Sequence, residues 1–106
     1  MAFTINGIDW NVVIVSPTDD RLRRSDGGIS IGVTDNNTKE IYISNLVRGG
    51  FFRKVLTHEV CHAICMSYDI FLPIEQEEIV CDFVATYGEE VFEIVDMLLS
   101  SMRRRA

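Results

Sequence analysis

The strongest constraint on the fold is the stretch Leu56 to Cys65, which holds both histidines of the chain. His58 and His62 lie four residues apart, and on an α-helix residues at this spacing project from the same face. Two imidazole nitrogens can then reach one metal ion. Glu59 follows the first histidine and falls about 60° around the helix from His62, beside such an ion rather than on it. The stretch therefore predicts a helix with a metal site on one face.

The spacing is that of an HExxH motif, in which two histidines bind zinc and the glutamate takes a proton from zinc-bound water. A catalytic zinc ion needs a third protein ligand and an open position for water. The chain has no third histidine, so a carboxylate or a thiolate must complete the site. We expect Glu78 to do so, because Asp82 follows it one turn later. From there Asp82 can accept the free ring N–H of a ligating histidine.

Glu77 and Cys65 are the alternative third ligands. The residue one turn after Glu77 is Cys81, a poor acceptor for an imidazole N–H, so we expect the Glu77 side chain in solvent. Cys65 lies one turn beyond the second histidine on the same face, and a thiolate with two histidines is known zinc chemistry. It also fits the stripe that must pack on a sheet. We expect the other two cysteines, Cys61 and Cys81, in the core.

The sequence pattern of residues 1–45 predicts strands. A first hairpin turns at Asn6-Gly7, because this dipeptide accepts the positive φ angles of a type I′ turn. A polar surface loop over residues 18–28 follows, with room for one helical turn. From residue 29, apolar residues alternate with small or polar ones up to a turn at residues 35–38. The alternation resumes from Glu40 to Ser44. We expect three or four strands, with one apolar face that needs a cover.

The sequence pattern after residue 45 predicts helices. From about Leu46 the apolar period becomes helical, which indicates a helix to about Ser67. Its stripe consists of Phe51, Val55, His58, His62 and Cys65. A second helix is expected from Pro73 to about Met102, because proline suits a first helical position and the glutamates that follow complement the helix dipole. The sequence leaves open whether Gly88 bends or breaks this helix.

Composition and charge limit the function further. The chain has 106 residues, so we expect one domain over 1–106. Its net charge of −6 disfavours nucleic acid as a partner, although the basic triplet Arg103 to Arg105 follows the second helix. No stretch is long and apolar enough to span a membrane, and no signal peptide is visible. Three cysteines cannot all pair, which is typical of a reducing compartment. These features predict a cytoplasmic protein that binds neither nucleic acid nor membrane.

The segments His58-Glu59-Val60-Cys61-His62 and Glu78-Ile79-Val80-Cys81-Asp82 together resemble the gluzincin pattern HExxH…ExxxD. The order of the elements is also similar to that of very short metallopeptidases of bacteria and phages, including the ImmA/IrrE-type group. The resemblance covers residues 29–87 in layout. It implies an α+β, zincin-like fold, with a small antiparallel or mixed sheet packed on the HExxH helix and one or two C-terminal helices after it.

The resemblance also assigns roles. His58, His62 and Glu78 would bind one Zn²⁺ ion, Glu59 would be the catalytic base, and Asp82 would hold a ligating histidine. Tyr68 and Tyr87 are candidate hydrogen-bond donors to the transition state. In the family, an extended peptide or protein substrate pairs with the strand before the HExxH helix. The corresponding residues here are Glu40, Ile41, Tyr42, Ile43 and Ser44.

The expected function is therefore hydrolysis of peptide bonds by a zinc-dependent peptidase. Larger members of the family close the cleft with a C-terminal subdomain, and the short segment after His62 predicts a shallower site with slow or selective cleavage. Two other functions stay open. One is a zinc-stabilised structural or interaction protein without turnover. The other is an SprT-like protein that acts on DNA-associated targets, which the acidic composition disfavours.

Overall fold

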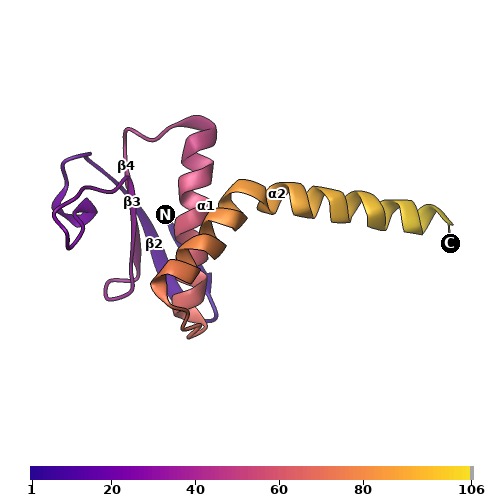
Figure 1. The fold of residues 1–106 in the computed structure, drawn as a ribbon, viewed down its shortest axis with the longest axis horizontal. Coiled ribbons are helices and arrows are strands. Elements are labelled where there is room, and N and C mark those ends of the chain that lie inside the picture. The colour runs from indigo at the N-terminus through magenta and orange to yellow at the C-terminus, as the bar shows by residue number, and fades with distance from the viewer. Residues whose placement is uncertain (106) are drawn as a thin grey trace.

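The computed structural model describes residues 1–105, with side chains through Arg104, and it confirms the α+β class (Figure 1). A four-stranded mixed sheet is followed by two helices. The elements are, in chain order, β1 (Ala2–Ile5), β2 (Ile8–Val15), the short 3₁₀ helix η1 (Asp20–Leu22), β3 (Gly32–Asp35), β4 (Glu40–Ser44), α1 (Gly49–Ser67) and α2 (Ile74–Arg105).

Both expected hairpins are present. Asn6 and Gly7 have φ angles of 51° and 75°, and Ile5 pairs with Ile8, so the first turn is the tight one predicted. The second hairpin joins β3 to β4, and the Asp35 carboxylate accepts a hydrogen bond from the backbone of Asn37 (2.8 Å). The side chain of Asp35 thereby closes the turn from within.

The strand order is β1-β2-β4-β3, and β2 pairs with β4 in parallel. The loop between β2 and β3 contains the one helical turn that the sequence allowed, η1. It is more than a surface loop, because Leu22 in η1 is fully buried against Val15 and Tyr42. This loop carries the chain over one face of the sheet and delivers β3 to the far edge, beside β4.

The sheet is covered by α1 on one face and in part by the loop that contains η1 on the other, so the expectation of a single apolar face was wrong. The main core lies between the sheet and α1, and its fully buried members include Trp10, Ile41 and Ile43. The smaller cluster around Leu22 covers the part of the opposite face that β3, β4 and the end of β2 form. Because successive side chains of a strand point to opposite faces, β4 supplies both clusters and is buried along most of its length.

Helix α1 begins at Gly49, slightly later than expected, and ends at Ser67 as predicted. Phe51 is 54% exposed, so the buried stripe starts at Val55 rather than at Phe51. The end of the helix is fixed to the sheet by two contacts. The Trp10 indole N–H donates to the Ser67 hydroxyl (2.8 Å), and the Asn6 side chain donates to the Ser67 carbonyl (3.1 Å). These contacts set the position of the histidine-bearing helix on the sheet.

Helix α2 starts at Ile74, and Pro73 caps it from outside, because the Pro73 carbonyl accepts hydrogen bonds from Gln76 and Glu77. The helix passes through Gly88 without a break. Its first half packs across α1, and its second half extends away from the rest of the protein (Figure 1). Among the described residues, no helix has the length and apolar character needed to cross a membrane.

Candidate metal centre

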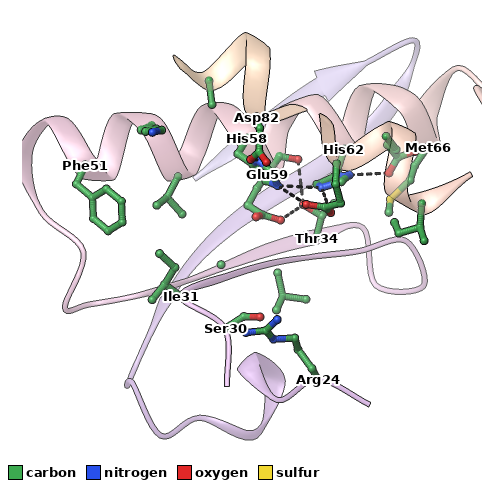
Figure 2. A pocket seen from close by; sticks show the side chains of 18 of the residues that line it. Arg24, Ser30, Ile31, Thr34, Phe51, His58, Glu59, His62, Met66 and Asp82 are labelled. Carbon is green, nitrogen blue, oxygen red and sulfur yellow. Dashed lines mark hydrogen bonds and ion pairs between the residues drawn. The ribbon is translucent and has the colours of Figure 1, made fainter. Parts of the chain in front are cut away.

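The two histidines face each other on α1. His58 and His62 lie one turn apart, and their Nε2 atoms are 3.1 Å from each other. The His62 side chain is 8% exposed and that of His58 17%, so both rings are held between α1 and α2. Figure 2 shows the pair at the wall of the cleft, above β3. The predicted placement of both histidines on one helical face is therefore confirmed.

Glu78 brings its carboxylate from α2 to both of these nitrogens. Its Oε1 lies 2.8 Å from His62 Nε2, and its Oε2 lies 3.2 Å from His58 Nε2. Ligand atoms in a tetrahedral site lie roughly 3.3–3.4 Å apart when each is about 2.0–2.1 Å from the metal. The distances among the three residues are close to this spacing. His58, His62 and Glu78 thus form a group of side chains able to hold one metal ion.

Each histidine also has a carboxylate partner for its other ring nitrogen. Asp82 Oδ1 lies 2.9 Å from His58 Nδ1, as the spacing after Glu78 predicted. Glu77 Oε2 lies 2.6 Å from His62 Nδ1. Glu77 is 8% exposed, so the expectation that its side chain points into solvent was wrong. The two helices pack so that His62 contacts the turn of α2 that carries Glu77, and His58 contacts the next turn, which carries Asp82.

These contacts suit a metal ion bound through Nε2 of each ring. A neutral histidine has one N–H group and one lone pair. With a metal ion on both Nε2 atoms, the Nδ1 N–H groups would donate to Asp82 and Glu77. The cation would also separate the Nε2 lone pairs from the Glu78 carboxylate, which otherwise repel one another. The donor set of two imidazoles and one carboxylate therefore fits a divalent metal ion, and is one that zinc uses.

Glu59 lies beside this group and not within it. It is 7% exposed, and the Thr34 hydroxyl lies 2.8 Å from its Oε1 and 2.9 Å from its backbone carbonyl. Burial raises the pKa of the Glu59 carboxyl, whereas the Thr34 hydrogen bond and the nearby histidines oppose that rise. The side chain is thus held in one orientation next to the ligands (Figure 2).

Two residues of β3 that sequence reasoning missed support Glu59. One is Thr34, and the other is Gly32. A Cβ atom on Gly32 would lie 2.9 Å from the side chain of Val55 and 3.2 Å from Cγ of Glu59. Only glycine therefore lets β3 approach α1 this closely. A glycine within an alternating apolar pattern is itself a signal of close backbone approach, and this signal could have identified the position.

The cleft next to these residues has a volume of about 750 Å³. Its floor is the segment 29–34, which includes the first three residues of β3, and its walls come from α1 and the start of α2. Two cationic side chains, Arg24 and Lys54, lie among the residues that line it, and Figure 2 shows Arg24 at the end far from the histidines. This volume is within the usual range of ligand pockets.

The edge of the sheet at this cleft is β3, not β4. Strand β4 pairs with β2 on one side and with β3 on the other, so neither of its edges is open. The expectation that an extended substrate pairs with Glu40–Ser44 was therefore wrong. The reason is the parallel pairing of β2 with β4, which joins segments distant in sequence and leaves no local signal.

The open edge of β3 can be assigned residue by residue. Ser44 N–H donates to Ile31 O (2.9 Å), and in an antiparallel pair alternate residues point to the partner strand. The backbone groups of Gly32 and Thr34 therefore point to the open edge. Ser30 N–H is already bonded to Leu22 O (2.8 Å), which ends the open edge on that side.

The remaining candidate residues lie away from this group. Tyr68 and Tyr87 are 54% and 52% exposed and are not among the residues that line the cleft, so the structure does not bring either tyrosine to the site. Cys65 is buried, and it belongs neither to the group of His58, His62 and Glu78 nor to the residues that line the cleft. Cys81 is fully buried as expected, whereas Cys61 is only partly buried.

Comparison with known proteins adds no relative, because no protein-family model, curated protein or solved structure matches the chain. The function therefore has to follow from the site and its chemistry.

Proposed function

We propose that this protein is a zinc-dependent peptidase with a zincin-like fold. The observation that supports it best is the pairing of each histidine Nδ1 with its own carboxylate. Glu77 holds His62 and Asp82 holds His58, and both Nε2 atoms meet the Glu78 carboxylate at the wall of an open cleft. A structural zinc site has four protein ligands and is closed, whereas three ligands at a cleft are typical of a catalytic one.

The donor set favours zinc over other common ions. Magnesium and calcium prefer oxygen ligands, whereas two imidazoles with one carboxylate suit zinc. Zinc in such a site polarises a carbonyl group and lowers the pKa of water to about 7. His58, His62 and Glu78 would hold the ion, while Glu77 and Asp82 would keep each ring in the tautomer that binds it.

Glu59 is the residue best placed to move a proton. Its carboxylate is buried next to the three ligands, and Thr34 fixes one of its oxygens (2.8 Å). The other oxygen is free to accept a proton from water during attack on a peptide carbonyl, and then to return it to the leaving amine. A general base of this kind contributes about 10²–10⁴-fold to a rate.

The open edge of β3 provides a place for the substrate. An extended peptide can add to a free strand edge by main-chain hydrogen bonds, and here those would come from Gly32 and Thr34. Their side of β3 faces the cleft that contains the histidines. A peptide bound in this way would lie across the metal ligands with little demand on its side chains. The substrate class that follows is an extended segment of a peptide or unfolded protein.

The test is cleavage of a complex peptide mixture, with new termini identified by mass spectrometry. The zinc-loaded protein should produce new termini, and Glu59→Gln should produce none while it retains bound zinc. Glu75→Gln is a matched control, because Glu75 is exposed in the first turn of α2 and away from the ligands. Equal cleavage by the wild type and by Glu59→Gln would contradict the proposed role, and a zinc-loaded wild type without any cleavage would contradict the peptidase function.

A further inference from the structure

The second half of α2 forms an arm that touches α1 only near its start, where Glu89 pairs with Arg53 (3.3 Å), and no described element covers the rest of it. Residues 89–104, here called the arm, are all exposed, and the helix that carries them extends beyond the sheet and α1 (Figure 1). The radius of gyration of the protein is 16.1 Å, whereas a compact chain of this length has about 13 Å. The arm accounts for this excess, and the protein is 56 Å long in its longest dimension.

Helix α2 carries a regular apolar seam that continues into the arm. Apolar residues recur along α2 at alternating spacings of four and three, which is the heptad pattern of a coiled coil. The seam consists of Val80, Val84, Tyr87, Val91, Ile94 and Leu98. Its last four members are each between 43% and 52% exposed. Helices in water obtain most of their stability from packing of such a seam, so a partner helix is needed to cover it.

We infer that the partner is the arm of a second copy of this chain, which lies antiparallel to the first. The charges beside the seam support this pairing. In a heptad, the positions on either side of the seam decide orientation through their charges. Within the described part of the arm, these flanking positions hold two charged residues, Glu90 and Arg104, and both lie on the same side of the seam.

An antiparallel pair brings the same side of each seam together, whereas a parallel pair brings opposite sides together. Setting Ile94 of one copy level with Leu98 of the other places Glu90 within one turn of Arg104, and the two-fold symmetry repeats the contact. In a parallel pair, Glu90 would instead lie opposite Val95 on the other flank of the partner, so Glu90 and Arg104 would not meet. Complementary charge therefore selects the antiparallel dimer, with the two cores at opposite ends of the paired arms.

The first test measures self-association of the full chain by sedimentation equilibrium, from micromolar to near-millimolar concentration. The wild type should form dimers. Leu98→Asp should abolish them, whereas Leu99→Asp, a change of the same chemistry outside the seam, should leave them intact. Both residues lie in the exposed arm, so neither change should affect folding of the core. A monomeric wild type, or equal loss in both variants, would overturn the inference.

The second test decides the orientation. Glu90→Arg and Arg104→Glu should each weaken the dimer about tenfold, because each places like charges opposite one another. The double variant, with both changes, should restore the dimer. Glu93→Arg and Arg103→Glu are matched controls on the opposite side of the helix, and they should have little effect. A parallel dimer predicts no loss in the single variants, and this result, like assembly into a larger oligomer, would contradict the antiparallel pair.

Discussion

The contact between Glu77 and His62 gives the sharpest prediction about the metal site. Glu77 is 8% exposed, and its carboxylate lies 2.6 Å from the ring nitrogen that does not face the cleft. Glu77→Gln keeps the volume and the hydrogen bond but removes the charge. A hydrogen bond to a charged group contributes about 1.5–3 kcal/mol and a neutral one about 0.5–1.5 kcal/mol, so the loss is roughly 1–1.5 kcal/mol. That corresponds to about a tenfold weaker zinc affinity.

Removal of the whole side chain should cost more. Glu77→Ala leaves a buried ring N–H without a partner, and the loss of a residue that holds a ligand typically costs about 10–100-fold in metal affinity. Asp82→Asn should have a smaller effect than Glu77→Ala, because the Asp82 side chain is 70% exposed and water can replace its contact. Competition against a fluorescent zinc indicator would rank these variants, with Glu75→Gln as the unaffected control. Wild-type zinc affinity in Glu77→Ala would show that Glu77 does not hold His62 for metal binding.

Two further predictions concern stability. Gly32→Ala should destabilise the protein by about 1–3 kcal/mol in thermal unfolding, because the new methyl group would lie 2.9 Å from the side chain of Val55. Gly50→Ala is the control, because a methyl group there meets nothing within 4 Å. A Gly32→Ala variant as stable as the wild type would show that β3 does not approach α1 this closely. Zinc at about 100 times its dissociation constant should raise the free energy of unfolding of the wild type by about 2.7 kcal/mol. The same zinc concentration should stabilise His58→Ala far less. Equal stabilisation of both proteins would contradict the site.

The features that the sequence predicted correctly depend on local spacing. The first hairpin followed from Asn6-Gly7, and the end of α1 at Ser67 followed from the helical period. The contact of His58 with both Glu78 and Asp82 followed from the spacing of four on each helix. Such patterns depend on a few neighbouring residues, so they can be predicted without knowledge of the tertiary contacts.

The features that the sequence did not predict depend on contacts between distant segments. The parallel pairing of β2 with β4 moved Glu40–Ser44 from the edge to the middle of the sheet. The rotation of α2 against α1 buried Glu77, one residue away from the expected ligand. Both outcomes are set by packing of the whole core, which periodicity along one element cannot specify. The role of Thr34 was missed for the same reason, because its partner Glu59 is on another element.

X-ray absorption at the zinc edge, on protein purified without chelators, is the most direct test of the metal centre. We predict one zinc ion per chain, with nitrogen and oxygen ligands at about 2.0–2.1 Å and no sulfur ligand. We also predict that His58→Ala and Glu78→Ala lose this signal. A sulfur ligand at about 2.3 Å would assign the third position to Cys65 instead. A protein that stays free of zinc when zinc is supplied would contradict the metal centre of His58, His62 and Glu78.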